Sequence, residues 1–211
     1  MLIPVVIAVV GLATTAAQND PILDYYWSRA RATLKSRDPR ETGARFSFVG
    51  RTFQKKIGNK GETVSVDSAT VVYYYSFGHL DSSSVLRGDP RRLRAIDLPF
   101  PNIFDSSYVI HDFPNDTGGS LIAIGFDTDT VGVRDPVGLA IMDRRTYVPR
   151  WAYLFYPNKA GYRRFTRSYR LIEEQGLIFP DSVWEVATKD EFLFSTTYRL
   201  ETGISKITVY R

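Results

Sequence analysis

Cysteine is absent from this chain of 211 residues, and only two histidines, His79 and His111, are present. The core must therefore form without disulfides, and neither a cysteine pair nor a histidine cluster can hold zinc. A catalytic triad would need one histidine beside a nucleophile such as those in Ser82–Ser84, but no G-x-S-x-G motif is present. We interpret this co-occurrence as chance, so the sequence predicts no enzyme, no metal site and no cofactor.

Charge is absent from the first seventeen residues. Leu2–Leu12 is almost continuously apolar, and Thr14–Gln18 then supplies the small residues typical of a signal-peptidase site. The run is shorter than the roughly 20 residues of a membrane-spanning helix. Residues 1–17 are therefore predicted to be a secretory signal peptide, although no Lys or Arg precedes the run; an uncleaved anchor is the alternative. Because no cysteine follows, a lipoprotein-type lipid anchor is excluded.

The formal net charge is +4, from 27 basic and 23 acidic residues. We interpret the basic residues as spread along the chain, with a single local excess at Arg87–Arg94. Nucleic-acid binding usually requires a concentrated basic stripe, so nucleic acid is not an expected partner. Aromatic residues reach 14%, and they favour the half-buried surfaces of sheets. The composition therefore predicts a β-rich protein.

One amphipathic helix is predicted at the start of the mature chain. Asp20 can cap it, and Pro21 suits its first turn. An apolar stripe at helical spacing follows, formed by Leu23, Trp27, Ala30 and Leu34. Pro39 and Gly43 end the pattern. Such a helix needs a sheet on which to lie.

The remainder is predicted to be that sheet. Strands are expected at Phe46–Lys56, Thr63–Phe77, Ser120–Asp127, Val137–Asp143, Pro149–Tyr156, Arg163–Glu173, Leu177–Ala187, Glu191–Glu201 and Ile204–Arg211. The short connections, including Gln175–Gly176 and Thr202–Gly203, favour antiparallel neighbours. Residues 78–117 are predicted to be irregular, with helical turns near Arg91–Ala95 and Asn102–Tyr108, and could form a lid. The expected fold is a single, mainly β (α+β) domain over residues 18–211. The protein is expected to be a monomer.

Eleven residues fall at strand spacing across these segments, and we expect them to line an apolar cavity on the concave face of a curved sheet. They are Tyr73, Tyr75, Phe77, Ile122, Ile124, Phe126, Leu139, Ile141, Trp151, Tyr153 and Phe155. The competing interpretation is ordinary core beneath the helix. The cavity is favoured because the apolar strand faces exceed what one helix can cover.

Two short stretches carry a resemblance to a known family. They are Gly138–Asp143 followed by Tyr147–Trp151, and Phe179–Trp184 continuing to Ile204–Ile207. Together with the leader, the first helix and the long meander, they resemble the LolA/LolB-like outer-membrane lipoprotein-sorting proteins. The resemblance implies an antiparallel half-open β-barrel with an N-terminal helix and short covering helices. It also implies an apolar cavity that shields acyl chains, and no enzyme activity.

The leading functional hypothesis is a carrier, in the periplasm or at the periplasmic face of the outer membrane, that holds the acyl chains of a lipoprotein or another lipid. Because a dry cavity is sufficient for this, no reactive group is needed. The alternative is a structural or protein-interaction module of the cell envelope that docks on a protein partner by strand pairing. The third hypothesis is a hydrolase that uses His79 or His111.

Overall fold

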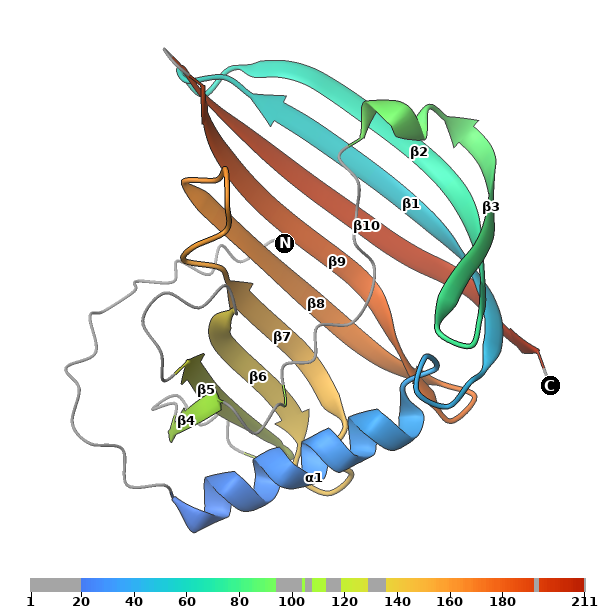
Figure 1. Cartoon of the computed structure of the whole chain (residues 1–211), viewed down its shortest axis with the longest axis vertical. Helices are drawn as coiled ribbons and strands as arrows, with labels where there is room; N and C mark the ends of the chain where they lie inside the picture. The colour runs from blue at the N-terminus through green and yellow to red at the C-terminus, as the bar shows by residue number, and fades with distance from the viewer. Residues whose placement is uncertain are drawn as a thin grey trace.

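A computed structural model describes residues 20–93, 104, 108–112, 119–128, 136–191 and 194–210. The predicted signal peptide lies outside these residues. In chain order the elements are α1 (Pro21–Arg37), β1 (Arg45–Ile57), β2 (Thr63–Ser76), β3 (His79–Gly88), the 3-10 turn η1 (Pro90–Arg92), β4 (Tyr108–Asp112), β5 (Leu121–Thr128), β6 (Val137–Asp143), β7 (Pro149–Phe155), β8 (Arg164–Glu174), β9 (Leu177–Glu191) and β10 (Phe194–Tyr210) (Figure 1).

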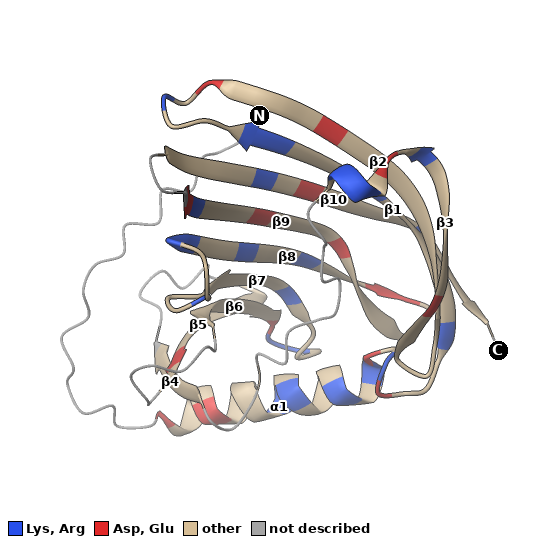
Figure 2. Cartoon of the chain, turned by 45° about the horizontal axis from the view of Figure 1, so that its top comes forward, with Lys and Arg blue, Asp and Glu red and all other residues tan. Residues whose placement is uncertain are grey.

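The ten strands form one antiparallel sheet in the order β3-β2-β1-β10-β9-β8-β7-β6-β5-β4. Strands β3 and β4 are its two edges, so within the described residues the sheet does not close on itself. It curves around the side on which α1 lies, as Figures 1 and 2 show. The prediction of a mainly β, half-open antiparallel barrel with one N-terminal helix is confirmed.

Two hairpins have turns of two residues that force neighbouring strands to be antiparallel. Phe77–Gly78 joins β2 to β3 and Gln175–Gly176 joins β8 to β9, and all four residues have positive φ angles. Two consecutive residues with positive φ match the hairpin turn whose twist fits that of the flanking strands. Gln175–Gly176 was predicted as a turn, whereas Phe77 was predicted to be part of the strand. Strand β2 ends at Ser76 because the chain reverses there.

Helix α1 forms as its sequence predicts. The Asp20 carboxylate accepts a hydrogen bond from the Ile22 amide at 2.8 Å, which caps the first turn. The buried residues of the helix are the four of the predicted apolar stripe. At its centre, the Trp27 ring lies 4.6 Å from that of Phe104 and 5.4 Å from that of Phe126 on β5. The helix therefore packs across the β5 side of the sheet.

Because side chains alternate along each strand, the sheet has two distinct faces. The inner face, toward α1, carries most of the core, including Ile122, Ile124 and Phe126 on β5 and Ala140 and Met142 on β6. The outer face is more exposed, and none of the described helical elements contacts it extensively. We call these two sides of the sheet the inner face and the outer face.

Three predictions about the chain path are wrong. The turn at Thr202–Gly203 does not form, because β10 runs through it: Thr202 is paired with Thr52 on β1 and Gly203 with Ser182 on β9. Residues 78–117 are not wholly irregular, since they contain β3 and β4. Of the expected covering helices, the described residues contain only η1, and Tyr108 begins a strand; the rest of the predicted turn at 102–108, apart from Phe104, lies outside them.

Candidate functional site

Four aromatic side chains line the inner face of β1 and β2, three of them stacked and the fourth, Tyr73, tilted against Phe48. We call them the inner aromatic wall: Phe46, Phe48, Tyr73 and Tyr75. The Phe46 and Tyr75 rings are parallel with centroids 5.0 Å apart, and those of Phe48 and Tyr73 are 5.3 Å apart. The strand register brings them together, because Phe46 is paired with Tyr75 and Phe48 with Tyr73. The two phenylalanines are buried, whereas the two tyrosines are only half-buried.

A glycine makes room for the wall. A Cβ atom on Gly50 would lie 3.0 Å from the Tyr73 ring, so the ring packs directly over the backbone of β1. Burial raises the pKa of the Tyr73 phenol above its usual value, which is consistent with a hydroxyl that is partly removed from water. The wall is thus apolar, with phenol groups at its less buried side.

Helix α1 is too small to cover the inner face. Its 17 residues span roughly 25 Å, whereas ten strands span roughly 43 Å across the sheet. The other described helical element, η1, contacts the inner face where the Gln54 amide donates a hydrogen bond of 3.1 Å to the Arg92 carbonyl. Among the described elements, neither α1 nor η1 therefore lies over most of the β1–β2 side of the inner face, although Phe46, Phe48 and Val71 on that side are buried.

Beyond the wall, the inner face becomes polar although its residues stay buried. The hydroxyl groups of Thr52 and Thr202 are hydrogen-bonded at 3.0 Å. On β8 and β9, Arg167 and Glu185 form an ion pair in which the guanidinium Nη2 and Nε atoms lie 2.7 and 3.1 Å from Glu185 Oε2. The side chains of the pair are 10% and 3% exposed. This ion pair is a deeply buried polar group in an otherwise apolar surface.

The protonation of Arg167 is secured by its surroundings. Burial by itself would lower the pKa of the guanidinium, but Tyr169, whose hydroxyl lies 3.3 Å from Nη1, and Glu185 outweigh it and raise the pKa above its usual value. Arg167 is therefore a permanent buried cation matched by a carboxylate. It also lies with its guanidinium carbon 5.4 Å from the centre of the Phe165 ring.

The eleven predicted lining residues do not share one face. Tyr73 and Tyr75 lie in the inner aromatic wall, and Ile122, Ile124 and Phe126 lie on the inner face beneath α1. Five others lie on the outer face: Leu139, Ile141, Trp151, Tyr153 and Phe155. The register decides this, because Ile124 is paired with Ala140, which places the neighbouring residues of β6 on the opposite side. The eleventh, Phe77, lies in the hairpin turn and is 69% exposed.

Sequence reasoning did not identify two components of the inner face. Phe46 and Phe48 were assigned to a strand but not to the site, although their spacing places them on one face. Arg167 was not singled out, although it alternates with Phe165 and Tyr169 and so shares their buried face. The alternation was the available signal in both cases.

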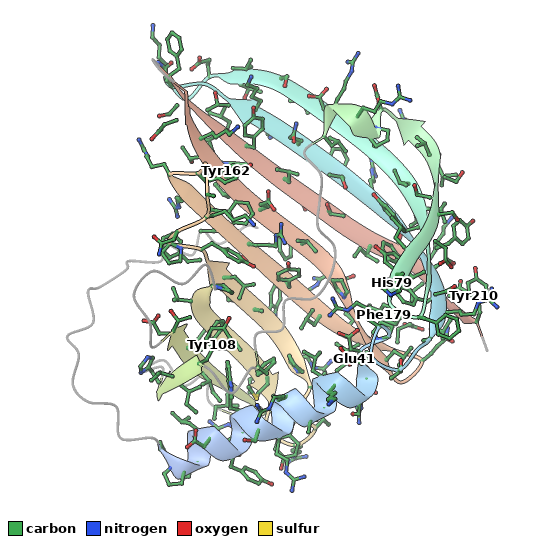
Figure 3. The ribbon with its side chains drawn as sticks, viewed as in Figure 1. Glu41, His79, Tyr108, Tyr162, Phe179 and Tyr210 are labelled. Atoms are coloured by element: carbon green, nitrogen blue, oxygen red, sulfur yellow. The ribbon has the colours of Figure 1, made fainter. Side chains whose placement is uncertain are left out.

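The residues considered for hydrolysis lie apart. His79 is on the edge strand β3, and His111 is on β4 at the opposite edge of the sheet. His79 and Tyr108, labelled in Figure 3, mark these two edges.

Within the described part of the chain, no group of three or more His, Asp or Glu side chains could hold a metal ion. No helix in that part is long and apolar enough to cross a membrane.

No protein-family model and no curated protein matches this chain. Among solved structures, it is similar to a LolA superfamily protein from Nitrosomonas europaea, with 9% identity and a TM-score of 0.40 over 89% of this chain and 93% of the other. It is also similar to a domain from Vibrio parahaemolyticus named for outer membrane lipoprotein sorting, with 11% identity and a TM-score of 0.45 over 88% and 92%. The superfamily of the first structure is the one that the sequence resembles.

Proposed function

We propose that the protein is a carrier that holds the acyl chains of a lipid or lipoprotein against the inner aromatic wall. The observation that supports this most directly is the half-burial of Tyr73 and Tyr75 on a face that the described helices leave largely uncovered. An apolar surface of this kind can remove hydrocarbon from water without any reactive group. The role requires neither a metal nor a cofactor.

The hydrophobic effect supplies the energy. Each buried methylene contributes about 0.8 kcal/mol, so ten methylenes contribute roughly 8 kcal/mol before the costs of association. Stacked rings suit this task, because they offer a large apolar area with few rotatable bonds. The phenol groups of Tyr73 and Tyr75 can meet the polar end of the ligand, since each combines an apolar ring with a hydroxyl.

Uptake of a fluorescently labelled fatty acid tests the proposal, with native mass spectrometry of gently purified protein as a second measurement. The variant Y73S/Y75S should bind the probe more weakly. It removes on the order of 100 Å² of apolar contact, which corresponds to about 2.5 kcal/mol and a roughly sixty-fold higher Kd.

Tyr74 provides a matched control on the same strand. It lies between the two test residues but points to the outer face, and its side chain is 39% exposed. The variant Y74S should leave probe binding unchanged. A wild-type protein that takes up no probe and carries no lipid would refute the carrier proposal. Equal losses of probe binding in Y74S and Y73S/Y75S would show that the inner aromatic wall is not the binding surface.

The open edge of the sheet favours a second candidate, a protein-interaction module. All ten residues of the edge strand β3 are exposed, so its free side could pair with a strand of an envelope protein. Two irregularities in the β2–β3 register count against it, because such bulges commonly protect edges from pairing. Under this candidate, the variant S83P should abolish capture of the partner and leave fatty-acid uptake intact.

A further inference from the structure

The outer face of the sheet carries an unusual apolar surface, which we call the outer aromatic patch: Leu139, Ile141, Trp151, Tyr153, Phe155 and Trp184. The Trp151 ring lies nearly parallel to those of Trp184 and Tyr153, with centroids 6.1 and 6.3 Å apart. All six side chains are partly or substantially exposed. From β6 to β9, the patch spans roughly 14 Å across the strands.

The same face of the same sheet shows what an ordinary solvated surface looks like here. On β10 the outer residues of the central part are glycine or polar, namely Thr197, Arg199, Glu201, Gly203 and Ser205. Antiparallel sheets normally alternate in this way between a buried apolar face and a polar one. The patch departs from that rule on β6, β7 and β9. Because β10 belongs to the same curved antiparallel sheet and follows the rule, the curvature of the sheet and its antiparallel pairing do not explain the apolar patch.

Half of the patch, namely Trp151, Tyr153 and Phe155, lies in a strongly basic stretch of the chain. Residues 144–170 contain eight Lys and Arg and none of the 23 acidic residues, and they also contain eight aromatic side chains. The prediction that Arg87–Arg94 holds the only local excess of basic residues is therefore wrong. Figure 2 shows the basic positions along β7 and β8.

Several of these cations surround the rings. Arg170 shares the outer face and lies with its guanidinium carbon 5.9 Å from the Trp151 ring, while also pairing with Asp181. Arg164 shares that face near the Phe155 end, and Arg145 is exposed in the turn before β7. Arginines thus lie at both ends of the apolar centre, and at the Trp151 end Asp181 and Asp143 lie beside them.

We propose that the outer aromatic patch docks the protein on an anionic phospholipid membrane surface. Trp and Tyr rings favour the boundary between headgroups and acyl chains, and neighbouring arginines attract anionic headgroups. A phospholipid surface satisfies both requirements at once, because it presents hydrocarbon below a layer of negative charge. This surface lies on the opposite side of the sheet from the inner aromatic wall, so the inference is independent of the carrier proposal.

Tryptophan fluorescence gives a direct test, because the full chain contains three tryptophans and Trp27 alone lies outside the patch. In the variant W27F, vesicles of phosphatidylcholine with phosphatidylglycerol should shift the emission to shorter wavelength, and brominated lipid should quench it. Where W27F does not fold, the reverse variant W151F/W184F should lose the quenching seen in the wild-type protein. Quenching reports on the patch itself, even if another part of the chain also binds vesicles.

Charge variants give the second test. R145Q/R164Q should weaken partition into the anionic vesicles about thirty-fold, since each arginine near such a surface contributes about 1 kcal/mol, or roughly five-fold. The matched control R51Q/R199Q removes two exposed arginines from the outer face of β1 and β10, and it should have a several-fold smaller effect. Raising the salt concentration should weaken binding further.

Three results would overturn the inference: tryptophans that stay unquenched on bound protein, equal partition into vesicles of phosphatidylcholine alone, or equal losses in the two arginine variants. Retention on poly-glutamate without any effect of anionic vesicles would assign the patch to an acidic protein partner and would also overturn it.

Discussion

Breaking the buried ion pair between Arg167 and Glu185 should destabilise the protein strongly, whereas replacing both residues should not. The pair lies in a region where the side chains are only 10% and 3% exposed, so each charge depends on the other for solvation. Removing one partner from a buried pair costs about 3–5 kcal/mol, whereas a well-packed apolar pair is roughly neutral. The expected order of stability is therefore wild type, close to R167M/E185L, followed by each single variant.

Urea denaturation measures this. With an m-value of about 3 kcal/mol/M for a chain of this length, a loss of about 4 kcal/mol lowers the midpoint by about 1.3 M. The double variant should lie within about 0.5 M of the wild type, since it loses the hydrogen bond to Tyr169 but leaves no buried charge.

Acidification should separate the two single variants. The remaining carboxyl group in R167M can be neutralised by protonation, whereas the remaining guanidinium in E185L cannot. Relative to the wild type at the same pH, lowering the pH should relieve the defect of R167M and not that of E185L. A double variant that loses the sum of the two single losses would refute the reasoning, because it would show that the pair is not coupled.

Three further predictions concern the sheet. A Cβ atom on Gly138 would lie 1.8 Å from the Tyr153 carbonyl oxygen, so G138A should lower the thermal midpoint markedly, whereas G203A, with no atom within 4 Å, should leave it unchanged or raise it. Phe77 has a φ of 51° and is 69% exposed, so F77N should raise the free energy of unfolding by about 1 kcal/mol in urea titrations, without changing fatty-acid uptake. Hydrogen bonds, above all from the Thr146 backbone amide, lower the pKa of the Asp143 carboxyl group. The stability that this carboxylate contributes is therefore present at neutral pH and is lost as the pH falls through the lowered pKa. Thermal unfolding across pH should show D143A less stable than wild type at neutral pH and indistinguishable from it in strong acid.

The sequence by itself determined the elements that depend on local patterns. Helix α1 follows from Asp20, Pro21 and a stripe at helical spacing, and all of these act within a few residues. The turn at Gln175–Gly176 and the strand Val137–Asp143 likewise follow from local turn chemistry and β-forming composition. The antiparallel order follows in turn, because connections this short leave no room for crossovers.

Only the tertiary structure decided which side of the sheet each side chain occupies. Strand β6 is apolar on both faces, so the alternation of its residues could not show that Leu139 and Ile141 point away from Ile124. The pairing of β6 with β5 decided which residues of β6 lie on the inner face. Long-range pairing also carried β10 through Gly203, against its local turn signal, and brought Arg167 to Glu185. These outcomes depend on partners far apart along the chain, where local propensity is weaker than the burial and hydrogen bonding that the complete sheet provides.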